Sequence, residues 1–132
     1  MICVLICDDH QIVRQGIKQI LADASDLSLA GEAASGPEAI ARVRAGGIDV
    51  VLMDIAMPQR DGLDVLKQLR AEFPKLPVLM LSTYPDRQYA VRSLKLGAAG
   101  YLNKSADAEQ MTEAIRRVAG GRLVITPHVA AP

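Results

Sequence analysis

The stretch ICVLICDDHQ, residues 2–11, places an unbroken apolar run directly before two aspartates. Apolar runs without alternating polar residues are typical of parallel strands that are covered on both faces of a sheet. The run therefore predicts a buried central strand, and Asp8 and Asp9 stand where that strand ends. Cys3 and Cys7 within it are about 13 Å apart at strand rise, beyond the reach of a disulfide.

Similar runs recur along the chain and alternate with helical patterns. Unbroken runs predict central strands at 50–53 and 78–81, a run of mixed polarity predicts an edge strand at 27–34, and a weaker run predicts a strand at 99–102. Between these runs, apolar residues recur at helical spacing: Val13, Ile17, Ile20 and Leu21; Ala39, Ile40 and Val43; Leu63, Leu66, Leu69 and Phe73; Ala90, Val91 and Leu94; Met111, Ala114, Ile115 and Val118.

This alternation predicts one α/β domain with a flavodoxin-like (βα)5 fold. A chain of 132 residues is long enough for one hydrophobic core of ordinary size. Strands that are each followed by a helix imply right-handed crossovers and a three-layer sandwich. We expect a parallel sheet in the order 2-1-3-4-5, in which binding sites lie at the carboxyl ends of the strands, beside the switch point between the first and third strands.

Three carboxylates meet at that switch point. Asp8 and Asp9 end the first strand, and Asp54 ends the third. Their repulsion is expected to raise the pKa of at least one of them, and a cation among them would relieve it; oxygen ligands with room for water favour Mg²⁺. The ordinary alternatives are a helix N-cap for Asp8 and Asp9 and a turn residue for Asp54. The convergence of all three favours a metal site.

A hydroxyl and an ammonium group reach the same edge of the sheet from the other side. Ser82 ends the fourth strand, and Lys104 follows the fifth. Either residue alone is more often an ordinary surface group, but with the carboxylates they complete a set that can accept a phosphoryl group. Asp54 would attack phosphorus in line, while the cation and Lys104 neutralise charge on the equatorial oxygens.

The order and spacing of these residues resemble the receiver domains of two-component response regulators, from Ile2 to about Gly121. The motifs that carry the resemblance are Asp8 and Asp9; LMDIAMPQRDGL at 52–63, with Asp54, Met57, Pro58 and Gly62; VLMLS at 78–82, with Ser82; and GAAGYLNK at 97–104, with Tyr101 and Lys104.

The resemblance implies that Asp54 is phosphorylated by a sensor histidine kinase or a phosphotransfer protein. The site residues that it implies are Asp54 as phosphoacceptor; Asp8, Asp9, Asp54 and the backbone carbonyl of Ala56 around Mg²⁺, with Asp8 acting mainly through water; Ser82, Lys104 and Tyr101 as phosphoryl-binding and switch residues; and Met57, Pro58 and Gly62 as residues that shape the loop. Tyr101 would turn inward as the loop carrying Ser82 closes, with the readout on the fourth helix, fifth strand and fifth helix. The alternative for Tyr101 is an ordinary aromatic residue on an edge strand.

Two positions depart from the pattern of that family. Ser105 follows Lys104 where the family commonly has proline, often with a cis bond. Because a non-proline cis bond costs about 2.5–4 kcal/mol, we expect the Lys104–Ser105 bond to be trans. Ala56 stands where related domains often carry a polar side chain that affects phosphate loss, so the lifetime of the phosphoryl group stays open.

The last residues, GGRLVITPHVAAP at 120–132, resemble the start of the linker in NarL/FixJ (LuxR-type) regulators. These regulators continue into a helix-turn-helix domain that binds promoters. We therefore expect a receiver domain at 1–120 and the start of a linker at 121–132, in which His128 is incidental. A homodimer is compatible with the family, and the alternative is a stand-alone receiver or phosphorelay intermediate.

Proteins of other classes fit the residues less well. A haloacid dehalogenase-like phosphohydrolase needs a second carboxylate two residues after its nucleophile, and that position is Ala56. A flavodoxin-like electron carrier needs donors to a flavin phosphate after the first strand, where Asp8 and Asp9 would repel it. A degenerate receiver is disfavoured because the acids and Lys104 are all present. We expect a phosphoacceptor that at most assists its own phosphorylation and dephosphorylation, not an enzyme.

The charge balance and the hydropathy pattern limit the partners. The chain carries 15 basic and 15 acidic residues, so it has no net positive field to hold DNA or an anionic membrane surface. No stretch resembles a signal peptide or a membrane span. We expect a cytoplasmic protein that by itself binds neither nucleic acid nor membrane.

Overall fold

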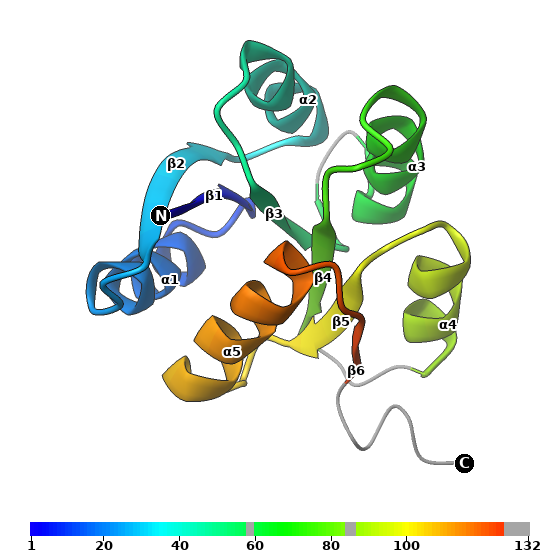
Figure 1. Ribbon diagram of the computed structural model, residues 1–132. Coiled ribbons are helices and arrows are strands. Elements are labelled where there is room, and N and C mark those ends of the chain that lie inside the picture. Colours follow the sequence, from blue (N-terminus) through cyan, green and yellow to red (C-terminus); the bar gives the residue numbers. More distant parts are fainter. Residues whose placement is uncertain (58–59, 84–86, 126–132) are drawn as a thin grey trace.

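A computed structural model describes residues 1–57, 60–83 and 87–125 of the chain, which form a central sheet with helices on both faces (Figure 1). Along the chain the elements are β1 (Ile2–Cys7), α1 (Gln11–Ala22), β2 (Leu27–Ala33), α2 (Gly36–Ala45), β3 (Val50–Asp54), α3 (Gly62–Glu72), β4 (Val78–Ser82), α4 (Arg87–Lys95), β5 (Gly100–Asn103), α5 (Ala108–Ala119) and β6 (Val124–Ile125).

The strands lie in the order β2-β1-β3-β4-β5-β6, and every pair is parallel. The predicted order 2-1-3-4-5 of a flavodoxin-like α/β fold is therefore confirmed. The sixth strand was not predicted, because two residues are too few to show a strand pattern. It lies within 121–132, so part of the segment expected as linker pairs with the sheet. The absence of a side chain at Gly100 permits this pairing, since a Cβ there would lie 2.5 Å from the carbonyl oxygen of Val124.

Two hydrophobic clusters, one on each face of the sheet, explain the unbroken apolar runs. Successive residues of a strand point to opposite faces. Leu5 therefore belongs to the cluster that α2, α3 and α4 cover, while Val4 and Ile6 belong to the cluster that α1 and α5 cover (Figure 1). Both faces must be apolar because helices cover both. Cys7 is a buried free thiol whose pKa is raised by burial, and Cys3 is also free.

Side-chain hydrogen bonds cap the N-termini of α2, α3 and α5. Ser35 accepts from the backbone N–H of Glu38 at the start of α2, and Asp61 accepts from the backbone N–H of Asp64 at the start of α3. Asp107 and Gln110 bond reciprocally at the start of α5. Each of these caps satisfies backbone donors that a helix N-terminus leaves unpaired.

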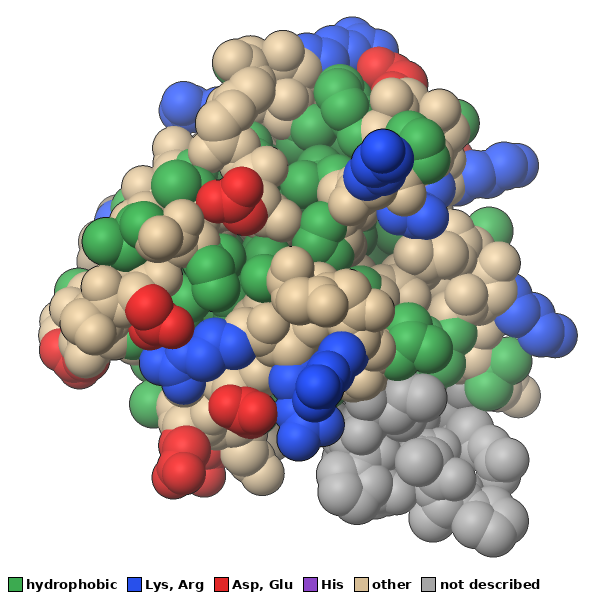
Figure 2. All heavy atoms as spheres, viewed as in Figure 1, with side chains coloured by type: hydrophobic (Ala, Val, Ile, Leu, Met, Phe, Trp, Pro, Cys, Tyr) green, Lys and Arg blue, Asp and Glu red, His purple; other side chains and the backbone are tan. Residues whose placement is uncertain are grey.

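Charges of both signs lie on the face of the molecule in Figure 2, around a central group of hydrophobic side chains. This distribution agrees with the equal numbers of basic and acidic residues in the chain. Within the described ranges, every helix is too short or too polar to cross a lipid bilayer.

Candidate functional site

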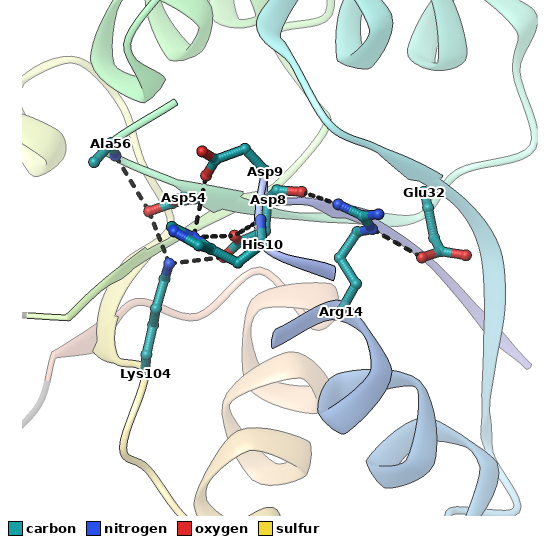
Figure 3. Close-up of polar contacts among 8 residues, drawn as sticks. All are labelled: Asp8, Asp9, His10, Arg14, Glu32, Asp54, Ala56 and Lys104. Carbon is teal, nitrogen blue, oxygen red and sulfur yellow. Dashed lines mark hydrogen bonds and ion pairs between the residues drawn. The ribbon is translucent and has the colours of Figure 1, made fainter. Parts of the chain in front are cut away.

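An acidic cluster lies at the carboxyl ends of β1 and β3, as the strand order predicts (Figure 3). The two strands are direct neighbours, with Cys7 paired to Met53. Asp8 is fully buried, Asp54 is 2% exposed, and Asp9 is exposed at the rim. Each of the residues Asp8, Asp9, His10 and Asp54 offers one ligand atom, and these atoms all lie within 4.8 Å of one another.

Lys104 reaches this cluster from the loop after β5. Its Nζ lies 2.7 Å from Asp8 Oδ2 and 3.1 Å from Asp54 Oδ1 (Figure 3). The backbone N–H of Lys104 donates to the carbonyl of Ser82 at 2.8 Å. Asn103 Oδ1 accepts from both the N–H and the hydroxyl of Ser105. These bonds hold the loop so that the ammonium group faces the two buried carboxylates.

The Lys104–Ser105 peptide bond is trans, since no cis peptide bond occurs in the described part of the chain. This agrees with the expectation from serine at position 105. The turn that proline would shape is formed here by the side chain of Asn103, whose carbonyl oxygen replaces a backbone acceptor.

Burial and charge shift the pKa values of the central pair. The pKa of Asp54 is raised above its usual value, first by burial and then by the charge of Asp8, although Lys104 and the N–H of Ala56 oppose the shift. The predicted rise of at least one carboxyl pKa is thus confirmed, with burial a larger cause than repulsion. Burial disfavours the ammonium group of Lys104, but its contacts with Asp8 and Asp54 outweigh this and raise its pKa.

One oxygen of Asp54 shows that the cluster fits a cation. Asp54 Oδ1 accepts from the N–H of Ala56 at 3.2 Å and lies near Lys104 Nζ. Asp54 Oδ2 is buried and has no hydrogen-bond partner among the described residues. A buried carboxylate oxygen without a partner is costly, and Mg²⁺ would satisfy it because that ion prefers oxygen ligands. The carboxylates of Asp8, Asp9 and Asp54 fit such an ion.

The N-cap alternative for Asp8 and Asp9 is wrong. The N-cap residue of α1 is His10, and its side chain makes no cap hydrogen bond. Asp8 Oδ1 instead accepts from the backbone N–H of His10 at 2.8 Å. The aspartates are therefore not explained by the start of the helix.

Three further residues belong to the surroundings of the cluster and were not predicted. His10 Nδ1 lies 3.2 Å from Asp8 Oδ1 and 3.2 Å from Asp9 Oδ1. Arg14 of α1 donates from Nη1 to the backbone carbonyl of Asp8 at 2.6 Å, and from Nε to Glu32 of β2 at 3.0 Å (Figure 3). Arg14 thus fixes the peptide that carries the buried aspartate. The only sequence signal was a charged residue beside the apolar stripe of the helix.

The remaining predicted residues lie close to the carboxyl edge of the sheet or outside the described residues. Ser82 is buried at the end of β4, and Met57 is buried in the loop after β3. Tyr101 is fully buried in the cluster under α2, α3 and α4. It is not on an edge strand, because β5 lies between β4 and β6. Pro58 and His128 lie outside the described residues.

Gly62 lets the loop after β3 return against the strand. Its N–H donates to the carbonyl of Ile55 at 2.7 Å. A Cβ at position 62 would collide with the carbonyl oxygen of Asp54 and would lie 2.8 Å from the Cα of Ile55. A side chain here would therefore push on the backbone that carries Asp54.

Replacing Gly62 with alanine is expected to lower the free energy of unfolding by about 2 kcal/mol, since overpacking against rigid atoms costs about 1–3 kcal/mol. Denaturant unfolding measures this change. Gly16→Ala is the matched control, because a Cβ at Gly16 in α1 meets no atom within 4 Å. Alanine should stabilise that helix by about 0.5–1 kcal/mol. A Gly62→Ala protein as stable as wild type would contradict the close approach.

Comparisons with known proteins agree with this geometry. The sequence pattern of the response regulator receiver domain matches residues 4–116. Response regulator GacA of Pseudomonas viridiflava is 40% identical over 130 residues, which are 98% of this chain and 61% of that protein. Response regulator UvrY of Escherichia coli is 36% identical over 130 residues, which are 98% of this chain and 60% of that protein. The chain thus spans about three fifths of the length of these relatives.

A solved structure shows the same architecture. The crystal structure of a two-component response regulator of the LuxR family, from an Aurantimonas species, matches with a TM-score of 0.92 and 27% sequence identity. The match covers 97% of this chain and 91% of that one.

Proposed function

The chain belongs to the response regulator receiver domain family, in the type found in LuxR and NarL regulators, and from this premise we propose that Asp54 accepts a phosphoryl group from a sensor histidine kinase. The phosphodonor can also be a phosphotransfer protein. The product is an aspartyl phosphate that changes the state of an output, and the protein acts in the cytoplasm. The domain assists at most its own phosphorylation and dephosphorylation.

The observation that carries the proposal is the buried oxygen Asp54 Oδ2, which has no hydrogen-bond partner within the described part of the chain. Ala56 and Lys104 hold the other oxygen, so the orientation of the carboxylate toward an incoming phosphoryl group is fixed. One oxygen of the Asp54 carboxylate forms a bond to phosphorus while the bond from phosphorus to the donor nitrogen breaks, and that nitrogen keeps the electron pair. Mg²⁺, when bound by Asp8, Asp9, Asp54 and the carbonyl of Ala56, supplies positive charge to the phosphoryl oxygens.

Lys104 links the phosphoryl group to the switch. Its ammonium group now pairs with Asp8 and Asp54, and a phosphoryl group on Asp54 offers it a stronger acceptor. The backbone bond from Lys104 to Ser82 connects this movement to β4. The hydroxyl of Ser82 binds a phosphoryl oxygen, and Tyr101, which is buried, acts as the switch residue that faces inward as the loop carrying Ser82 closes. The readout then lies on α4, β5 and α5.

The output of the switch lies beyond this receiver. Residues 1–120 act as the receiver and 121–132 begin a linker to a helix-turn-helix domain that binds promoter DNA. One relative that is 39% identical over 126 residues is named as a transcriptional regulatory protein, DegU of Brevibacillus brevis, which supports an output in transcription. A homodimer formed by receivers is part of this proposal. The alternative is a stand-alone receiver or phosphorelay intermediate, which would act without a DNA-binding output domain.

The test is phosphorylation by a small donor. The purified chain is incubated with acetyl phosphate in Mg²⁺ or in excess chelator, and its intact mass is followed. We expect a gain of one phosphoryl group in Mg²⁺ only, located on the peptide that contains Asp54. A folded protein that binds Mg²⁺ but gains no phosphoryl group would contradict the proposal, and the acidic cluster would then be a metal site of a degenerate receiver.

A further inference from the structure

His10 brings an imidazole to an otherwise all-oxygen cluster. Its ligand atom belongs to the group within 4.8 Å that also contains atoms of Asp8, Asp9 and Asp54. Its Nδ1 is equally distant, at 3.2 Å, from Asp8 Oδ1 and Asp9 Oδ1 (Figure 3). The ring thus lies against two of the carboxylates that would hold a cation.

The ring is held against the acidic cluster by its own contact with Asp8, since His10 Nδ1 lies within hydrogen-bond distance of Asp8 Oδ1. His10 is the N-cap residue of α1, but its side chain caps nothing. Its backbone N–H also donates to Asp8 Oδ1, at 2.8 Å. The side chain is 65% exposed, so the ring can turn about its side-chain bonds without displacing packed atoms. A lone pair on the imidazole can therefore face an ion held between the carboxylates.

The chemical type of the ligand atom decides which ions bind more tightly when an imidazole is present. Carboxylate and water oxygens suit Mg²⁺, whereas imidazole nitrogen suits first-row transition ions, whose affinities rise from Mn²⁺ through Co²⁺ to Cu²⁺. Asp54 Oδ2, which has no hydrogen-bond partner among the residues that the structure describes, indicates independently of His10 that a cation belongs in this cluster. A nitrogen ligand added at its rim changes the selectivity of the site and leaves its oxygen ligands in place.

We propose that His10 is a metal-selectivity residue, which coordinates a transition-metal dication beside Asp8, Asp9 and Asp54 and so lets the site bind Co²⁺-like ions in place of Mg²⁺. The proposal rests on the cation site of the proposed function, but not on phosphoryl transfer. It assigns to His10 a role in the choice of ion, since Mg²⁺ gains little from a nitrogen ligand.

The test compares the affinities of wild type and His10→Asn for MgCl₂ and CoCl₂ by calorimetry, without any phosphodonor. Asparagine keeps a short polar side chain that can donate to Asp8 and can start a helix, but it lacks the aromatic nitrogen. We expect the preference for Co²⁺ over Mg²⁺ to fall about tenfold in His10→Asn, within the range for groups that tune metal sites, with Mg²⁺ affinity nearly unchanged. An unchanged preference would overturn the proposal.

Two controls separate the site from incidental binding by histidine. His128→Gln removes the only other histidine of the chain and should leave the preference unchanged; a fall equal to that of His10→Asn would overturn the proposal. Asp54→Asn keeps His10 but should lose the tight Co²⁺ binding; if that binding persisted, the ring would act alone and the proposal would fail. A ¹⁵N-labelled histidine spectrum adds a direct readout, because Co²⁺ at the site should shift the ring signals of His10 in wild type. Failure of phosphorylation alone would leave these results unaffected.

Discussion

Asp54→Asn is expected to lose the phosphate adduct completely and, without metal, to be more stable than the wild type at neutral pH. Asparagine has nearly the same shape but no nucleophilic carboxylate oxygen, so no bond to phosphorus can form. The gain in stability follows from the buried position of Asp54, whose carboxyl pKa is raised by burial and by Asp8. A charge that the folded state disfavours is removed.

The direction of the pH dependence follows from the same shift. Because the folded state holds the proton of Asp54 more tightly than the unfolded state, ionisation costs stability as the pH rises from the ordinary carboxyl pKa of about 4 to the raised pKa of the folded state. The asparagine side chain of the variant does not titrate. The excess stability of the variant should therefore be largest at neutral pH and should shrink as the pH falls toward about 4. Denaturant unfolding in chelator at several pH values measures it.

The control for both readouts is Asp23→Asn, which changes an exposed aspartate at the end of α1. It should keep the adduct and the wild-type pH dependence. An adduct of equal yield on Asp54→Asn would assign phosphoryl transfer to another residue. If Asp54→Asn were less stable than the wild type at every pH, the contacts of Asp54 with Lys104 and Ala56 would outweigh the cost of its burial.

Lys104→Met is expected to lower the free energy of unfolding of the metal-free protein by about 3 kcal/mol, as for the removal of one partner from a buried ion pair. The side chain of Lys104 is 11% exposed and contacts two carboxylates that are 0% and 2% exposed. Methionine keeps the apolar stem but leaves Asp8 and Asp54 facing each other without a cation. Part of the loss should return when Mg²⁺ is added, because the ion replaces the missing positive charge.

Denaturant unfolding with and without Mg²⁺ measures the change, and Lys18→Met is the matched control. Lys18 pairs with Glu32 at the surface, where side-chain exposures are 29% and 33%, so its loss should cost about 1 kcal/mol or less. The double variant Lys104→Met/Asp54→Asn should be more stable than Lys104→Met alone, since it removes one of the facing charges. Equal losses for Lys104→Met and Lys18→Met would contradict a buried ammonium in the site.

The sequence predicted the sheet well because burial on both faces leaves a clear pattern. Runs such as 50–53 and 78–81 have no polar residue, and the structure shows why: their side chains point alternately into two hydrophobic clusters. The strand order then brought Asp8 and Asp54 together at one edge. Strand β6 left no such pattern because it has only two residues.

Contacts between elements distant in sequence were harder to predict. That Arg14 would bond both the Asp8 carbonyl and Glu32 depends on how α1 crosses β1 and β2, which periodicity does not define. The placement of His10 depends on one rotamer at the start of a helix. The sequence predicted that Lys104 and the two acids lie at the same edge of the sheet, but not that Lys104 Nζ contacts both carboxylates. Those contacts depend on the shape of its loop, which the Asn103 side chain determines.

The short strand β6 also joins the segment after α5 to the sheet. Its two residues pair with Gly100 and Tyr101, and the amide of Val124 is bonded to the carbonyl of Ala99 at 3.0 Å. Lys104 lies directly after β5, in the loop that leads to α5. Residues 124 and 125 are therefore anchored to the strand that bears the buried tyrosine. A sideways shift of β5 would therefore move β6 with it, and hydrogen exchange at the Val124 amide would report how stable this pairing is.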